Sequence, residues 1–254
     1  MRIGTWNVNS LRVRLPHLLE WLETDPVDVV GLQEIKMQDE QFPHEALRAA
    51  GWNAVSNGQK TYNGVAILSR QAIEDVVLDI PGFEDPQKRV IAATVGGVRV
   101  ICVYVVNGQA VGSEKYEYKM RWLSALHAYV TSEAAQHEKL AVVGDYNIAP
   151  APEDTHDPEV WEGGILCSDA ERAHYRELLD VGLVDCLALN PPEGETRFTW
   201  WDYRQAAFRR NMGLRIDHVL ASKALAATLS ECQIHLEPRR RERPSDHAPV
   251  SASF

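Results

Sequence analysis

The sequence predicts an α/β (α+β) protein in which two mostly antiparallel sheets pack face to face with helices outside them. Three observations lead to this fold class. Short apolar runs of strand length recur along the chain, and stretches with apolar residues at helical spacing stand between several of them. The run around Gly96-Gly97 has the two-glycine connection of a tight β-hairpin. Strands joined by hairpins, mixed with strands joined through helices, favour two packed sheets covered by helices.

The predicted elements follow one another along the whole chain. The first strand, residues 2–8, precedes a helix with one leucine-rich face, formed by Leu15, Leu18, Leu19 and Leu22. Two longer helices are predicted at residues 114–135 and 169–181. Further strands are predicted at 27–33, 64–69, 90–95, 98–106, 140–145, 216–221 and 249–254. Because no internal repeat and no apolar-poor linker divides the sequence, we expect a single domain over residues 1–254.

Composition narrows the classes of protein. The chain has 254 residues, 45% of them hydrophobic, which is enough to bury a sizeable core and excludes a disordered or collagen-like protein. It contains no apolar run of the roughly 18 to 20 residues that a membrane-spanning helix needs, and no apolar signal-peptide core at its start. The four cysteines stand apart, without a C-x-x-C pair. We therefore expect a cytoplasmic protein with reduced thiols and no membrane partner.

The charge is unevenly distributed. A net charge of -10 argues against a protein that coats nucleic acid or membrane with its whole surface. From Trp200 to the end, however, nine Lys/Arg stand against six Asp/Glu, and this part includes Arg204, Arg215 and the run Arg239-Arg240-Arg241. Such a run is commonly a solvated face. The basic run would indicate a surface for a polyanion only if the sequence also contains residues for chemistry on a polyanion.

Four segments place acids, amides or histidine at the end of an apolar strand. They are residues 5–10 (TWNVNS), 31–34 (GLQE), 143–147 (VGDYN) and 243–249 (RPSDHAP). Because neighbouring strands end at a common rim, such side chains tend to converge on one site. Each has a structural alternative: Glu34 as a helix-starting or strand-end charge, Asp145-x-Asn147 as a turn, and Ser245-Asp246-His247 as a capping segment.

Taken together, these groups supply the parts for phosphodiester hydrolysis. Glu34 and Asp246 offer the hard oxygen ligands that Mg²⁺ prefers, without the thiolate or multiple-histidine pattern of zinc. Asp145 can act as a general base or acid, and His247 can donate to a charged phosphoryl oxygen. Asn7 and Asn147 can orient a phosphate or a water. A metal, an activated water and donors around a non-bridging oxygen are what this hydrolysis requires.

The ordered motifs resemble the exonuclease III family of DNA repair nucleases, within the endonuclease/exonuclease/phosphatase superfamily. The resemblance covers residues 6–250 and rests on WNVNSLRVR, GLQE, TYNGVAILSR, DPQKRVIAAT, VYVVNG, GDYNIAP, FTWWDYR, GLRIDHVLAS and RPSDHAPV. GLRID and the preceding WDYR are similar to the DNA repair branch and unlike the lipid phosphatase branch. The resemblance implies a four-layer αββα sandwich.

The resemblance also implies roles for individual residues. It places the principal metal on Glu34, with Asn7 and Asp246 nearby, and a second metal position by Asp145, Asn147 and His247. Asp145 would activate the attacking water or protonate the leaving oxygen. Tyr104 and His247 would hold the scissile phosphate, with Asp217 fixing the tautomer and charge of His247. Asn9, Lys36 and Arg89, together with Arg204 and Arg215, would face DNA phosphates, and Phe198, Trp200 and Leu214 would line an apolar pocket for a deoxyribose or terminal nucleotide. Core packing is the alternative for these last three.

These inferences predict a monomeric phosphodiesterase of DNA repair that uses Mg²⁺ or Mn²⁺. Its expected partner is double-stranded DNA with nicks, 3′ blocks or abasic sites. Two alternatives remain: a superfamily phosphatase for a small or lipid phosphate, and a catalytically silent nucleic-acid-binding relative. Residues 148–168 predict a long surface loop that is rich in proline and acids and lacks Lys and Arg. We expect its acids and its apolar end, Ile165-Leu166, to face DNA or solvent and to favour 3′ ends over internal abasic sites.

Overall fold

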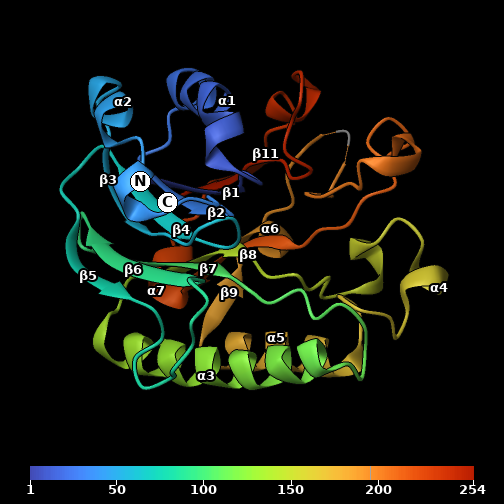
Figure 1. The fold of residues 1–254 in the computed structure, drawn as a ribbon. Coiled ribbons are helices and arrows are strands. Elements are labelled where there is room, and N and C mark those ends of the chain that lie inside the picture. The colour runs from blue at the N-terminus through green and yellow to red at the C-terminus, as the bar shows by residue number, and fades with distance from the viewer. Residues whose placement is uncertain (195) are drawn as a thin grey trace.

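Four layers make up the structure. Figure 1 shows the computed structural model, which describes residues 1–194 and 196–254. Two six-stranded sheets lie face to face in the middle (Figure 1). Helices α1 (Leu11–Thr24) and α2 (His44–Ala49) cover one sheet, and α3 (Glu114–Gln136) and α5 (Asp169–Asp180) cover the other. This αββα sandwich confirms the predicted fold class.

The first sheet has the strand order β11-β12-β1-β2-β4-β3. Its strands are β1 (Arg2–Asn7), β2 (Val29–Gln33), β3 (Asn53–Asn57), β4 (Val65–Ser69), β11 (Glu231–Ile234) and β12 (Val250–Ser253). Strands β1 and β2 run parallel, joined through α1, whereas the other neighbours are antiparallel. The two termini meet here, because β12 pairs with β1.

The second sheet has the strand order β5-β6-β7-β8-β10-β9. Its strands are β5 (Glu74–Leu78), β6 (Val90–Val95), β7 (Val98–Tyr104), β8 (Leu140–Asp145), β9 (Leu183–Asp185) and β10 (Asp217–Ser222). Strands β7 and β8 are parallel, joined through α3, and the other pairs are antiparallel. The predicted hairpin at Gly96-Gly97 joins β6 to β7 in register. Short helices α4 (Pro158–Trp161), α6 (Cys186–Leu189) and α7 (Lys223–Ala226) lie in the connections.

Four strands were not among those predicted from the sequence: β3, β5, β9 and β11. They are the edge strands of the two sheets. An edge strand is paired on one side only and is covered less completely than a central strand, so it needs a weaker apolar pattern. Every residue of β5 except Val77 is exposed, for example. The central strands β4 and β8 are fully buried and read as continuous apolar runs.

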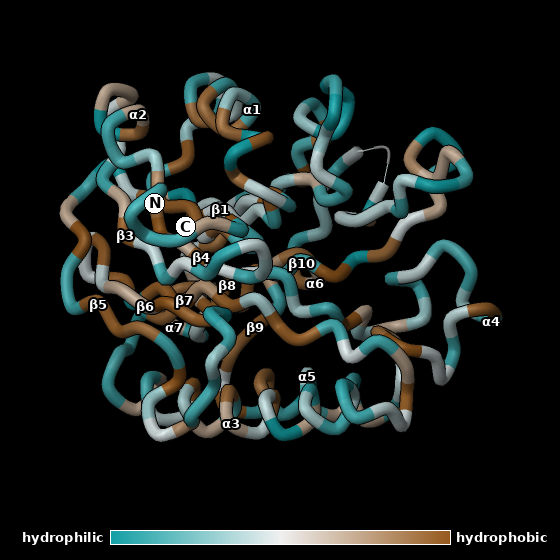
Figure 2. The backbone as a smooth tube through the Cα atoms, viewed as in Figure 1, coloured by the Kyte–Doolittle hydropathy of each residue, from teal (hydrophilic) through white to brown (hydrophobic). Residues whose placement is uncertain are grey.

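Three apolar layers hold the sandwich together. Between the sheets lie side chains such as Ile67, Val143 and Val219. Trp6 and Leu18 belong to the layer under α1 and α2, and a third layer, with Trp122 and Tyr175, lies under α3 and α5. Figure 2 shows the central strands of the second sheet, such as β6 and β7, as hydrophobic, and much of the outer surface as hydrophilic. None of the helices in the described part of the chain is long and apolar enough to cross a membrane.

Candidate active site

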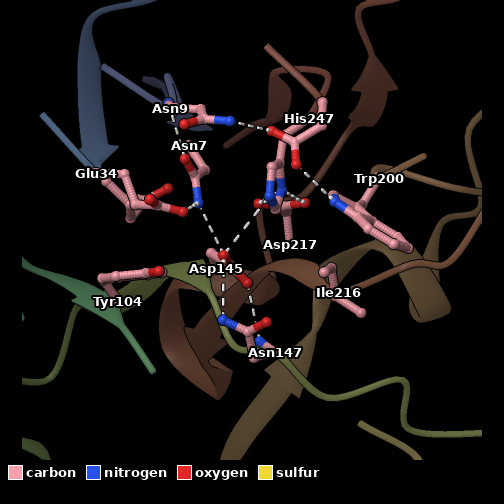
Figure 3. A network of polar contacts seen from close by, with 12 residues as sticks. Asn7, Asn9, Glu34, Tyr104, Asp145, Asn147, Trp200, Ile216, Asp217 and His247 are labelled. Carbon is pink, nitrogen blue, oxygen red and sulfur yellow. Dashed lines mark hydrogen bonds and ion pairs between the residues drawn. The ribbon is translucent and has the colours of Figure 1, made fainter. Parts of the chain in front are cut away.

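Strands of both sheets end at one rim and deliver polar side chains to it (Figure 3). Asn7 ends β1, and Glu34 follows the parallel strand β2. In the other sheet Asp145, at the end of β8, is in register with Tyr104 on β7 and with Asp217 on β10. Asp246 and His247 precede β12, which runs antiparallel to β1 and therefore starts at the same rim. The convergence predicted from the strand ends is present.

Asn7 joins the two sheets at this rim. Its buried amide Nδ2 donates to Glu34 Oε1 at 2.9 Å and to Asp145 Oδ2 at 2.9 Å. Its Oδ1 accepts from the backbone N–H of Asn9 at 3.0 Å. Because one amide bridges two acids on different sheets, Asn7 sets the separation of those acids.

Asp145, Asp217 and His247 form a buried acid–imidazole–acid arrangement. His247 Nδ1 donates to Asp217 Oδ2 at 2.9 Å, and its Nε2 lies 3.8 Å from Asp145 Oδ2. Burial opposes the charged imidazolium, but the charges of Asp217 and Asp145 outweigh it and raise the pKa of His247 to about 10. Burial also raises the pKa of Asp145 to about 7, against the opposing charge of His247. His247 is therefore a cationic donor at neutral pH, beside an acid that can exchange a proton there.

Asn147 borders Asp145 through the backbone as well as the side chain. Its N–H donates to Asp145 Oδ1 at 2.9 Å, and its Nδ2 donates to Asp145 Oδ2 at 3.3 Å and to the carbonyl of Val105 at 3.0 Å. Its backbone is left-handed, with φ 48°. Asn107, which the sequence interpretation did not single out, donates from Nδ2 to Asn147 Oδ1 at 3.1 Å. Asn107 comes shortly after the end of β7, so the strand-end rule could have found it.

A chain of charged and polar groups links Glu34 to Asp246. Lys36 Nζ lies 2.9 Å from Glu34 Oε2 and donates to Asn9 Oδ1 at 2.6 Å. Asn9 Nδ2 in turn donates to Asp246 Oδ1 at 2.9 Å, and Trp200 Nε1 donates to Asp246 Oδ2 at 3.0 Å. Burial disfavours the Asp246 carboxylate, but His247 and these two donors outweigh it and lower its pKa. Asp246 therefore remains ionised.

The acidic cluster at this rim could hold a metal ion. Carboxylate oxygens of Asp145 and Asp217 and a ring nitrogen of His247 lie within 4.8 Å of one another. Because both ring nitrogens of the cationic His247 carry protons, the carboxylates are the metal ligands in that state. The carboxylate of Glu34 is held by Asn7 and Lys36 and remains 18% exposed, so it stays reachable from solvent. Carboxylate and amide oxygens dominate this donor set, which suits a hard divalent cation better than a thiophilic one. The residues present thus fit the metal that the family resemblance implies.

Tyr104 and Arg89 stack beside the cluster. The Arg89 guanidinium lies 4.6 Å from the centre of the Tyr104 ring, and its Nη1 donates to the Tyr104 carbonyl at 3.1 Å. Its other nitrogens donate to Gln87 Oε1. Burial, with the nearby charge of Glu34, raises the pKa of Tyr104, so its hydroxyl stays protonated and can donate. Both residues line a groove of about 660 Å³ that also contains Asn107 and Lys115.

Arg215 is placed differently from the prediction. Its guanidinium is buried, forms two hydrogen bonds with Asp154 at 2.7 and 3.0 Å, and donates to Asp185 at 2.7 Å. The prediction that it faces DNA phosphates is wrong, because two buried carboxylates engage its donors. Arg204, by contrast, is 86% exposed beside Asp202.

The three predicted pocket residues are only partly together. Trp200 and Leu214 pair through backbone hydrogen bonds and pack in one apolar cluster with Ile216. Phe198 packs in a different cluster, with Trp201 and Ala248. Leu214 is fully buried, so of this pair the half-buried Trp200 carries the surface that a substrate could reach.

Residues 148–168 form a segment that is held against the rest of the protein and is not an open loop. Asp154 is fully buried against Arg215, and Leu166 packs beside Trp200 and Leu214. The expectation that all of its acids and its apolar end face DNA or solvent is therefore wrong for Asp154 and Leu166. Glu153, Glu159 and Glu162 remain exposed, so the outer surface of the segment is acidic.

Comparison with known proteins identifies the class. Residues 4–247 match the Endonuclease/Exonuclease/phosphatase family, and the chain belongs to that family. Exodeoxyribonuclease III of Haemophilus influenzae is 38% identical over the full length of both chains. The Neisseria protein NExo, solved as a 3′ phosphatase with a product DNA hairpin and as a 3′-5′ exonuclease, is 53% identical. Its TM-score is 0.97, and the match covers 100% of this chain and 99% of that chain. An AP endonuclease from Archaeoglobus fulgidus is 35% identical, with a TM-score of 0.95 and the same coverage.

Proposed function

We propose that this protein, a DNA repair nuclease of the exonuclease III type, uses Mg²⁺ or Mn²⁺ to hydrolyse phosphate esters at DNA 3′ ends in preference to internal abasic sites. The observation that carries the proposal is the Asp145–His247–Asp217 arrangement, which Asn7 connects to Glu34 at one rim. It combines a proton acceptor, a cationic donor and metal-binding oxygens within reach of one phosphate.

The chain's own residues supply the following chemistry. Asp145 takes a proton from the attacking water, while Asn147 and Asn107 hold the water and the phosphate in line. As the bond from the water oxygen to phosphorus forms, the bond from phosphorus to the DNA 3′ oxygen breaks, and this leaving oxygen takes a proton from solvent to become a 3′-hydroxyl. His247, kept protonated by Asp217, and the Tyr104 hydroxyl donate to non-bridging phosphate oxygens as negative charge develops there. Glu34 and Asp246 would hold the cation, which when bound supplies positive charge at the phosphate.

The acidic segment supports the preference for 3′ ends. An internal site requires duplex on both sides of the scissile bond, whereas a 3′ end requires it on one side only. The segment 148–168 packs against Trp200 and Leu214 beside the site, and its exposed acids repel a continuing phosphate backbone. The similarity to known structures supports the same preference. The NExo structures, described as a 3′ phosphatase and a 3′-5′ exonuclease, are 53% identical to this chain, whereas the AP endonuclease is 35% identical.

A panel of labelled duplexes tests the proposal. One duplex carries a nick with a 3′-phosphate, one a nick with a 3′-hydroxyl, and one an internal abasic analogue. We expect rapid release at both nicks with Mg²⁺, slower abasic incision, and no reaction in excess EDTA. Cleavage that persists in EDTA would remove the metal from the mechanism. Abasic incision faster than trimming at the nick would overturn the preference for 3′ ends.

A further inference from the structure

Lys119 is a fully buried cation on α3 that the chemistry above does not use. Its ammonium has three donors, and each has an acceptor: the carbonyl of Asn147 at 2.7 Å, the carbonyl of Asn107 at 3.2 Å, and Glu171 Oε1. Burial lowers the pKa of Lys119, and the charge of Glu171 opposes that effect. Two of its three bonds therefore end on the loops that carry the active-site amides.

Glu171, its partner on α5, is also fully buried and holds the end of the 148–168 segment. Its Oε1 accepts from the backbone N–H of Leu166 at 3.0 Å. Its Oε2 accepts from the N–H of Ser168 at 3.0 Å and from the Ser168 hydroxyl at 2.7 Å. The pair thus connects α3, α5, the two amide-bearing loops and the acidic segment.

The loops need such a restraint. Asn147 has a left-handed backbone, with φ 48°, a conformation that a non-glycine residue keeps only where its surroundings hold it, although asparagine tolerates it better than most. Asn107 donates from Nδ2 to Asn147 Oδ1, so the positions of the two amides are linked. A small displacement of either carbonyl would move both amides relative to Asp145.

We propose that Lys119 and Glu171 are positioning residues: their buried ion pair fixes the Asn107 and Asn147 amides in the active centre and ties them to the end of the 148–168 segment. This inference rests on the proposed function, because the amides act on the reacting phosphate. It requires that loss of the ammonium lowers kcat and leaves the KM for DNA nearly unchanged.

The test separates positioning from stability with single and double variants. Lys119→Met leaves a buried carboxylate without its cation, so the protein should lose both stability and kcat. In Lys119→Met/Glu171→Gln no charge is left unpaired, so Tm should recover in part. The ammonium that held the two carbonyls is still missing, however, so kcat on a 3′-phosphate nick should stay about 10- to 100-fold below that of the unchanged protein.

A second buried ion pair provides the control. Arg99 Nε donates to Glu133 Oε2, with both side chains nearly inaccessible, and Glu133 lies on α3 like Lys119. Arg99 is the second residue of β7 and lies near the far end of that strand from Tyr104. Arg99→Met/Glu133→Gln should therefore change Tm but leave kcat per folded molecule unaltered.

The outcomes are distinct for the two proposals. If the unchanged protein cleaves and kcat of the Lys119→Met/Glu171→Gln variant recovers together with Tm, the pair is only structural and the inference fails. A rise in KM at constant kcat overturns it as well. If the unchanged protein shows no cation-dependent cleavage, it is the proposed function that fails. Should Lys119→Met alone not fold, the double variant still decides the question.

Discussion

Substitution of Asp145 by Asn isolates proton transfer from binding. The side chain keeps its size, and its Oδ1 can still accept from the backbone N–H of Asn147, now at 2.9 Å. The substitution removes a carboxylate. Burial raises the pKa of this carboxylate to about 7, close to the pH at which it has to accept a proton. General acid–base catalysis is worth about 10²- to 10⁴-fold, or about 3 to 5 kcal/mol of barrier. We expect kcat to fall by that factor.

Asp145→Asn also affects folding. The new amide faces the donating Nδ2 of Asn7 and that of Asn147, so two hydrogen bonds are lost, each at a cost of about 1 to 3 kcal/mol of folding free energy. DNA binding should persist or tighten, because a negative charge beside the phosphate is removed. Single-turnover rates and fluorescence anisotropy on a 3′-phosphate nick measure both quantities, with the exposed Asp180→Asn as control. Turnover near that of the unchanged protein would show that the proton acceptor is another residue.

Three further predictions follow from the same site. Glu34→Ala should leave Tm nearly unchanged but raise the Mg²⁺ concentration needed for half-maximal rate; an unchanged requirement would exclude Glu34 as a ligand. Asp217 is the main charge that raises the pKa of His247 to about 10, so the activity that needs the imidazolium is present below that pH and is lost as pH rises through it. Asp217→Asn should therefore move the alkaline limb of the kcat profile to lower pH, and a limb that does not move would assign it to another group. Leu166 has φ 71°, which glycine adopts without strain, so Leu166→Gly removes the side chain that packs beside Trp200 and Leu214 without straining the backbone. The segment 148–168 should loosen, and abasic incision should increase more than 3′-end release on the labelled duplexes. Shortening residues 153–157 is a less clean test, because it removes the buried Asp154; if neither change alters the ratio of the two activities, the segment does not set substrate choice.

The sequence by itself determined the central strands, the long helices and most of the site. Central strands are buried on both faces, so their apolar runs are visible without a structure, as in β4 and β8. The polar residues at strand ends, Asn7, Glu34 and Asp145, were expected to meet because strands tend to end at a common rim, and the structure brings them together. The order of motifs along the chain then pointed to the family that residues 4–247 match.

The tertiary structure alone decided which charges meet substrate and which are enclosed. Arg215 stands in a basic part of the sequence, yet it is paired with Asp154, 61 residues away. Lys119 occupies the buried side of a helix, where its partner Glu171 lies 52 residues further on. The edge strands, such as β5, were likewise set by the neighbours they pair with. The physical reason is common to all three: a charge or a half-covered strand is stable only beside a particular partner, and local pattern carries no information about a partner so distant in the chain.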